Sequence, residues 1–193
     1  MKLKVNSEES LTRDKTEMNS FFVDRSKPSG VHKLSDIFGG LHDSPAIAEL
    51  MADETVRRRI LEDTIVEIVD SDDYMYIGDT DGRLVVGNKY LKEASEQFLY
   101  LDVIHELVHV KQFRNGANLY DTRYCYVDRP TEVEAYKLTV KEARRLGMSD
   151  KEIADYLLVE WITRKERDKL ARKLGVRVES RGRHKTQQMT KIP

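Results

Sequence analysis

The sequence has little cysteine and almost no net charge. Cys125 is the single cysteine in 193 residues, which excludes an intrachain disulfide and a zinc site built from several cysteines. The 33 Lys and Arg residues nearly balance the 34 Asp and Glu residues, so the overall charge does not indicate nucleic-acid or membrane binding. No apolar run reaches membrane-spanning length, and the polar N-terminus carries no secretory signal. We therefore expect a soluble, cytoplasmic protein without a membrane partner.

The composition suits one folded domain with a very polar surface. Hydrophobic residues make up 39% of the chain and charged residues 35%, and the length is short for two domains. Residues 1–40 are mostly polar, so we expect a flexible or loosely docked segment there. Residues 41–176 should form the single domain, and residues 177–193 a basic tail.

The most informative stretch is a helical run from about residue 94 to residue 115. It contains His105, Glu106 and His109 in the pattern H-E-x-x-H. Two histidines four residues apart lie one turn apart on a helix, so both imidazoles can reach one metal ion. The glutamate between them can hold a metal-bound water. The pattern is typical of zinc hydrolases; the alternative is an amphipathic helix with two hydrogen-bonded histidines.

The flanking sequence predicts an α+β fold. Apolar periodicity and turn signals predict, in chain order, a helix over 44–62, a strand over 64–69 and a hairpin formed by 74–77 and 83–86. A long, tyrosine-containing connection over 116–130 follows the helix with the two histidines. Three capping boxes then predict three helices: Thr131 with Glu134, Ser149 with Glu152, and Thr163 with Glu166.

A catalytic zinc site needs a third protein ligand. The oxygen donors that follow the two histidines most closely are Asp121, Asp128, Glu132 and Glu134. If Thr131 caps its helix, Glu134 is engaged in the reciprocal hydrogen bond of the capping box, whereas Glu132 has no such task. We therefore favour Glu132 as the third ligand, with Glu134 as the alternative.

Taken together, His105-Glu106-Leu107-Val108-His109 and Glu132-Val133-Glu134-Ala135 resemble the gluzincin metallopeptidases. In that family H-E-x-x-H on one helix is followed by E-x-x-A or E-x-x-S on the next. The small size is more similar to the ImmA/IrrE-type regulatory metallopeptidases than to large secreted enzymes, and the resemblance covers about residues 70–140. It implies His105, His109 and Glu132 as Zn²⁺ ligands and Glu106 as general base. It also implies a zincin-like fold, with a small antiparallel or mixed sheet packed on the metal-binding helix and a helical C-terminal half.

One position departs from the family pattern. Many gluzincins have an aspartate four residues after the ligand glutamate, and this chain has Tyr136 there. Tyr136 is therefore a candidate for supporting a ligand or for donating to the oxyanion, a role for which Tyr120, Tyr124 and Tyr126 also qualify. Asp102, one turn before His105, either substitutes for the missing aspartate or is an exposed acid on the helix.

These residues predict a peptidase that attacks a peptide or protein substrate with a metal-activated water. Glu106 would take the proton of that water and pass it to the leaving amine. The resemblance also implies an edge strand that pairs with the substrate, for which residues 83–86 are the candidate. The alternatives are a non-catalytic zinc or interaction protein and nucleic-acid binding through the basic residues after Thr163. Cys125 is either a small buried residue or a thiolate that caps the zinc ion.

Overall fold

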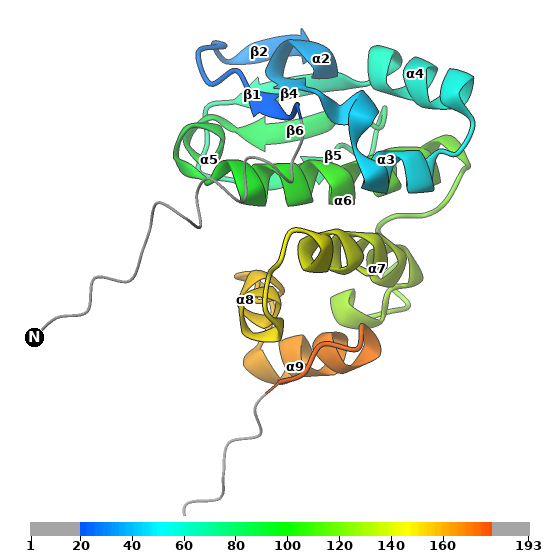
Figure 1. The fold of residues 1–193 in the computed structure, drawn as a ribbon, viewed down its shortest axis with the longest axis vertical. Helices are drawn as coiled ribbons and strands as arrows, with labels where there is room; N and C mark the ends of the chain where they lie inside the picture. Colours follow the sequence, from blue (N-terminus) through cyan, green and yellow to red (C-terminus); the bar gives the residue numbers. More distant parts are fainter. Residues whose placement is uncertain (1–19, 179–193) are drawn as a thin grey trace, which may run out of the picture.

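The structure is a computed structural model that describes residues 20–178. It is an α+β fold in which the sheet comes from the first half of the chain and the later part is helical (Figure 1). The elements are β1 (Phe22–Val23), β2 (Gly30–Lys33), α2 (Leu34–Ile37), β3 (Phe38–Gly39), η1 (Leu41–Asp43), α3 (Pro45–Leu50), α4 (Glu54–Asp63), β4 (Ile65–Val69), β5 (Met75–Ile77), β6 (Leu84–Gly87), α5 (Asn88–Glu93), α6 (Glu96–Arg114), η2 (Tyr126–Asp128), α7 (Pro130–Arg145), α8 (Asp150–Tyr156) and α9 (Arg164–Lys173).

The main sheet is small and mixed. Its strand order is β2-β4-β6-β5, with β4 and β6 parallel and the two outer pairs antiparallel. The predicted strand over 64–69 is confirmed as β4, and the predicted hairpin is confirmed as β5 and β6. Gly82 lies in the hairpin loop with a φ of 72°, a conformation that glycine adopts without steric cost.

The prediction that residues 83–86 form an edge strand beside the site is wrong. These residues lie in and next to β6, which pairs with β4 on one side and β5 on the other. All four residues of β6 are buried, as expected for a short, continuous apolar run in the interior of a sheet. The edge strand next to α6 is β5.

The part of the N-terminal segment that the structure describes, residues 20–40, is not loosely docked. β2 pairs with β4 along its whole length, and Leu34, Ile37 and Phe38 are almost completely buried in the core. Leu34 and Ile37 belong to the four-residue α2 and Phe38 to the two-residue β3, and elements this short do not give a sustained period in the sequence. Residues 1–19 and most of the predicted basic tail lie outside the described residues.

The predicted helix over 44–62 is two helices. Ser44 caps α3 with Pro45 in its first turn, as expected. The chain leaves the helical conformation at Met51, and Asp53 then caps α4 by accepting a hydrogen bond from the Val56 amide. Asp53 is a sequence signal for the start of a second helix, because aspartate is among the most favoured N-cap residues.

α6 is the central element of the fold. Twelve of its 19 residues are buried, because α6 packs against β5 and α7 and also contacts α3. Figure 1 shows α6 between the sheet and the group formed by α7, α8 and α9. The capping boxes at Ser149 and Thr163 are both present and open α8 and α9. Within residues 20–178, no helix combines the length and apolar character needed to cross a membrane.

Candidate metal centre

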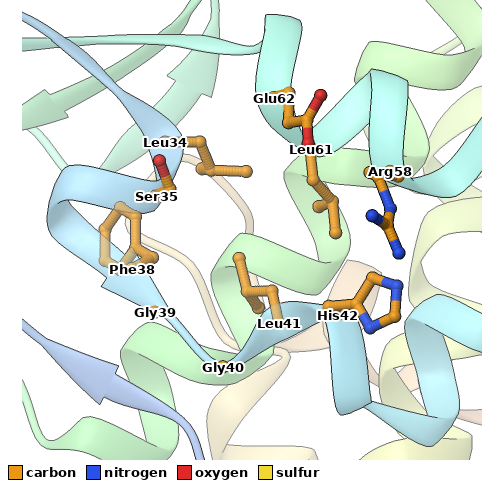
Figure 2. A pocket seen from close by; sticks show the side chains of 10 residues that line it. All are labelled: Leu34, Ser35, Phe38, Gly39, Gly40, Leu41, His42, Arg58, Leu61 and Glu62. Carbon is orange, nitrogen blue, oxygen red and sulfur yellow. The ribbon is translucent and has the colours of Figure 1, made fainter.

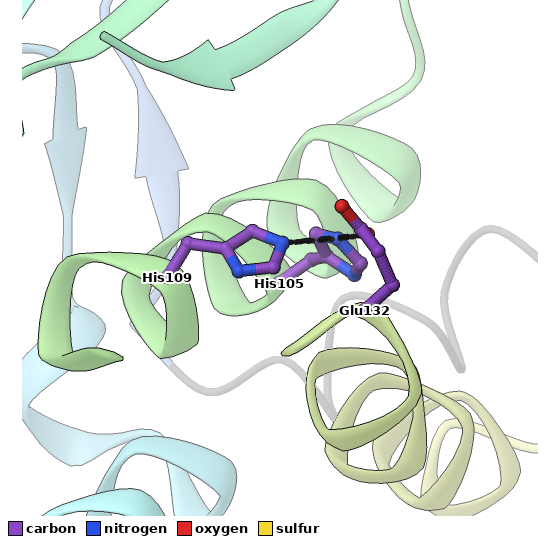
Figure 3. Close-up of side chains that lie close together, drawn as sticks. All are labelled: His105, His109 and Glu132. Carbon is purple, nitrogen blue, oxygen red and sulfur yellow. Dashed lines mark hydrogen bonds and ion pairs between the residues drawn. The ribbon is translucent and has the colours of Figure 1, made fainter. Parts of the chain in front are cut away.

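The two histidines of the H-E-x-x-H pattern lie one turn apart on α6 and face the same point. Their Nε2 atoms are 3.0 Å apart, and each side chain is buried with 6% of its residue surface exposed. Figure 3 shows the imidazoles of His105 and His109 directed toward one another on the side of α6 that faces α7. The helical spacing therefore produces the convergence that the sequence predicts.

Glu132, at the start of α7, completes a group of three potential ligand atoms. Its Oε2 lies 3.3 Å from His105 Nε2 and 3.4 Å from His109 Nε2. Ligand atoms that surround a tetrahedral ion at about 2.0 to 2.2 Å lie about 3.3 to 3.6 Å from one another. Two of the three separations already fit, and the two nitrogens need to separate by only about 0.3 Å. This buried cluster can hold a metal ion.

The start of α7 differs from the prediction, although Glu132 lies where it was expected. The helix begins with Pro130 at its first position and Arg129 as the N-cap residue, so Thr131 does not cap it. The capping box of Thr131 with Glu134 is therefore wrong, and with it the capping argument for Glu132, which leaves the family resemblance as the ground for that prediction. Proline favours the first helical position, and this signal would have given the correct start. Glu132 then lies in the first turn, facing the histidines on α6.

Glu134 is in the outer shell of the cluster and not in the cluster itself. Its Oε2 accepts a hydrogen bond of 2.8 Å from the Gln112 amide nitrogen, and the same nitrogen donates to the Thr131 carbonyl. Gln112 Oε1 accepts a hydrogen bond of 2.7 Å from His109 Nδ1. With the proton on Nδ1, the Nε2 atom of His109 has a free lone pair directed at the centre of the cluster.

His105 has different surroundings. Its Nδ1 atom is buried without a hydrogen-bond partner in the described part of the chain. The ring of Tyr136 packs against the imidazole ring of His105, with 4.3 Å between the ring centroids. Asp102 does not hydrogen-bond to His105; its carboxylate accepts instead from the hydroxyl groups of Tyr90 and Tyr156. Tyr136 therefore contacts a candidate ligand directly, whereas Asp102 acts on His105 only through its charge.

The cluster opens into a cavity of about 230 Å³ that Glu106 also lines. The Glu106 side chain is buried, and burial raises the pKa of its carboxyl group to about 8. A general base works best when its pKa is close to the working pH. Glu106 therefore has both the position and the basicity to exchange a proton with a molecule in the cavity.

The cluster residues also shift one another's pKa values. Burial lowers the pKa of His105. Burial would lower the pKa of His109 too, but the carboxylates of Glu132 and Glu106 raise it to about 9. Burial would raise the pKa of Glu132, yet the two adjacent histidines hold it well below its ordinary value. The Glu132 carboxylate thus stays ionised, and its Oε2 atom is buried without a hydrogen-bond partner in the described part of the chain, which leaves this oxygen free to bind a cation.

Several residues that the sequence reading did not single out line the same cavity. They are Met75, Tyr76 and Ile77 of the edge strand, together with Leu119, Arg129 and Trp161. Arg129 Nη1 lies 3.5 Å from Glu132 Oε1, so a positive charge is present at the rim of the cluster. These residues are distant from the histidines in the sequence, and no local pattern links them to the motif.

Two of the four candidate tyrosines line the cavity. Tyr120 donates a hydrogen bond from its hydroxyl group to the Ile77 carbonyl, and Tyr126 bonds to the Tyr136 hydroxyl at 2.9 Å. Tyr124 is exposed and does not line the cavity. Cys125 is also exposed, and its thiol donates to Asp128 at 2.7 Å, so neither predicted role for this cysteine is confirmed.

A separate, more apolar cavity of about 190 Å³ lies between the α2–β3 segment and α4 (Figure 2). Leu34, Phe38, Leu41 and Leu61 supply much of its lining. Among its described lining residues, the ionisable ones are His42, Arg58 and Glu62, and it shares no lining residue with the cavity at the histidines. His42 is therefore separate from the candidate metal centre.

Some of the basic residues near the C-terminus form ion pairs with acids of the same chain. Lys169 and Lys173 of α9 each form an ion pair of 2.5 Å with Asp128. Arg177 pairs with Asp150 at 3.0 Å. Within the described residues, these three cations are therefore partly neutralised by acids of η2 and α8.

Comparisons of the chain with models of known families, with curated proteins and with solved structures found no match.

Proposed function

We propose that this protein is a zinc-dependent peptidase of the gluzincin type, with a zincin-like fold. The observation that carries the proposal is the convergence of His105 Nε2, His109 Nε2 and Glu132 Oε2 within 3.0 to 3.4 Å beside the buried Glu106. Two imidazoles and one carboxylate are the ligand set of catalytic zinc sites, which keep one position open. A zinc ion bound there would lower the pKa of a bound water and polarise a substrate carbonyl.

Glu106 is the general base in this proposal. It lines the cavity at the cluster, and its raised pKa suits the uptake of a proton from the attacking water. The same carboxyl group then delivers the proton to the leaving amine. Tyr126 and Arg129 line the cavity and supply hydrogen-bond donors for the negative charge that develops on the carbonyl oxygen, whereas the hydroxyl group of Tyr120 already donates to the Ile77 carbonyl.

β5 offers the backbone groups for binding an extended peptide. The Gly87 amide donates to the Tyr74 carbonyl and the Gly78 amide donates to the Arg83 carbonyl, so the backbone groups of Tyr74 and Gly78 face β6. The backbone N–H and C=O groups of the alternate residues, Met75 and Ile77, therefore face the free edge. The Tyr120 hydroxyl group already bonds to the Ile77 carbonyl on that edge. A peptide that pairs with β5 would run past the cluster, because residues of β5 line the same cavity.

The test is hydrolysis by the zinc-loaded protein and by its Glu106→Gln variant. A mixture of unstructured peptides is incubated with each protein, and the new termini are identified by mass spectrometry. We expect cleavage by the unchanged protein and a loss of about 10² to 10⁴ in rate for the variant, with zinc content retained. The exposed substitution Glu93→Gln is the matched control and should leave the rate unchanged.

The result also separates an enzyme from a zinc-binding protein without activity. Equal cleavage by Glu106→Gln and the unchanged protein would point to a contaminating peptidase and contradict the assigned base. Zinc binding without cleavage of any peptide would favour the non-catalytic alternative.

A further inference from the structure

A further pocket, distinct from the two cavities described above, lies next to the candidate metal centre and has mainly aromatic walls. Its volume is about 300 Å³, and its aromatic lining residues are Tyr74, Tyr90, Phe98, Tyr136 and Tyr156. We refer to it as the aromatic pocket. Tyr74 and Phe98 are 40% and 41% exposed, so part of the wall is accessible from solvent.

Asp102 supplies a carboxylate to the aromatic pocket. Its Oδ1 accepts a hydrogen bond of 2.7 Å from the Tyr156 hydroxyl, and its Oδ2 accepts one from the Tyr90 hydroxyl. These bonds orient the carboxylate and favour its ionised form, against the effect of burial, which raises the pKa of Asp102. Each oxygen of an ionised carboxylate can accept more than one hydrogen bond, so Asp102 retains capacity for a ligand. A carboxylate removed from water is stabilised most effectively by a cation.

The charges around the aromatic pocket favour a positively charged ligand. Its described lining residues include Asp155 as a second acid and no basic residue. Glu160 adds a third carboxylate nearby, since it accepts a hydrogen bond of 3.0 Å from the Tyr74 hydroxyl. Arg167 lies 3.9 Å from Asp155, but its guanidinium group is bound more closely to Asp168, at 2.8 Å. Aromatic faces together with carboxylates are the surroundings in which proteins bind organic cations.

The aromatic pocket also adjoins the expected path of a substrate. Tyr74 directly precedes β5, and its ring lies 6.4 Å from that of Trp161, which lines the cavity at the histidines. Tyr136 lines the aromatic pocket and packs against His105. An extended peptide paired with β5 would therefore pass the pocket a short distance from the metal centre.

We propose that the aromatic pocket binds the basic side chain of an arginine or lysine residue of the peptide substrate. That the bound residue belongs to a substrate rests on the proposed peptidase function. Binding of the cation itself does not require hydrolysis. The cation contacts the faces of Phe98 and Tyr156 and donates hydrogen bonds to Asp102. The enzyme would then select peptides with a basic residue near the cleaved bond.

Two small probes test cation binding without turnover. N-acetyl-arginine amide and N-acetyl-citrulline amide have nearly the same shape, but only the first carries a charge. Each is titrated into the full-length zinc-loaded protein, and binding is followed by two-dimensional amide NMR. We expect the arginine probe to bind on the order of tenfold more tightly, with shifts at residues of the aromatic pocket.

Three variants locate the binding. Asp102→Asn should reduce the affinity for the arginine probe to that for the citrulline probe, and Phe98→Leu should weaken the arginine probe several-fold. Phe98 is half exposed, so this second variant tests the pocket even if Asp102→Asn folds poorly. Asp72→Asn is the control: its side chain is 80% exposed and pairs with Lys89, so binding should not change.

Equal binding of both probes, or an unchanged affinity in Asp102→Asn and Phe98→Leu, would overturn the inference. A change in zinc affinity alone in Asp102→Asn would show that Asp102 serves only His105, which also overturns it. Selective binding of the arginine probe by a protein that cleaves no peptide would support the pocket and refute the peptidase function, so the two failures are distinguishable.

Discussion

Replacing Gln112 by leucine should weaken metal binding while the fold is retained. Gln112 Oε1 accepts a hydrogen bond of 2.7 Å from His109 Nδ1, and both residues are buried, with 7% and 6% of their surfaces exposed. Leucine has a similar volume but no acceptor. Without the acceptor, the imidazole of His109 loses the bond that fixes its tautomer and its angle.

The expected loss follows from the position of this bond next to a candidate ligand. Removal of such an outer-shell partner typically lowers metal affinity by about 10- to 100-fold, or about 1.4 to 2.7 kcal/mol. The metal-free fold should lose about 1 to 3 kcal/mol, because the N–H group of His109 Nδ1 is left buried without an acceptor, whereas water can replace the donor that the exposed Glu134 loses. The loss of zinc affinity is therefore measured separately from the loss of stability.

Competition with a chelator of known zinc affinity measures the dissociation constant of zinc. Thermal unfolding of the metal-free protein measures the stability of the fold. The matched control is the exchange Gln112→Glu with Glu134→Gln, in which a carboxylate accepts from His109 and an amide donates in return. It should recover most of the affinity that Gln112→Leu loses. Unchanged zinc affinity in Gln112→Leu would refute the assigned role of the outer shell.

Three further results are expected. Zinc at 100 times its dissociation constant should stabilise the fold by about 2.7 kcal/mol, or about 5 to 11 °C in differential scanning fluorimetry, and His105→Ala should abolish this shift. Thr163→Ala removes the N-cap of α9 and should lower the free energy of unfolding in urea by about 1 kcal/mol; no change would mean that the capping box contributes nothing. The Cys125 thiol and two lysine ammonium groups hold the pKa of Asp128 well below its ordinary value. This stabilisation is present above about pH 4 and is lost on further acidification, so the unfolding temperature of Asp128→Asn should fall less steeply with acid than that of the unchanged protein.

The part of the site that depends on helical spacing could be predicted from the sequence. His105 and His109 converge because residues four apart share a face of one helix, and the caps of α8 and α9 follow from their own residues. The family resemblance also predicts Glu132, whereas the capping argument for Glu132 is contradicted by the start of α7 at Pro130.

The rest of the site depends on which elements pack together, and local patterns do not contain that information. β5 is an edge strand and β6 an interior strand because β6 pairs with β4, in a register that joins Val66 to Leu84, 18 residues later in the chain. Arg129 reaches the cavity because α7 packs against α6, and Trp161 because the connection between α8 and α9 lies against Tyr74 and Tyr126. The docking of residues 20–40 could not be predicted because their strands are too short to give a clear alternation of apolar and polar residues.

The most direct test of the metal centre is the zinc content of the purified protein and of its ligand variants, measured by elemental analysis after dialysis against zinc. About one zinc per chain is expected for the unchanged protein and for Glu134→Ala, with near-complete loss in His105→Ala and Glu132→Ala. Loss in Glu134→Ala together with retention in Glu132→Ala, or no zinc in the unchanged protein, would contradict the site described for this fold.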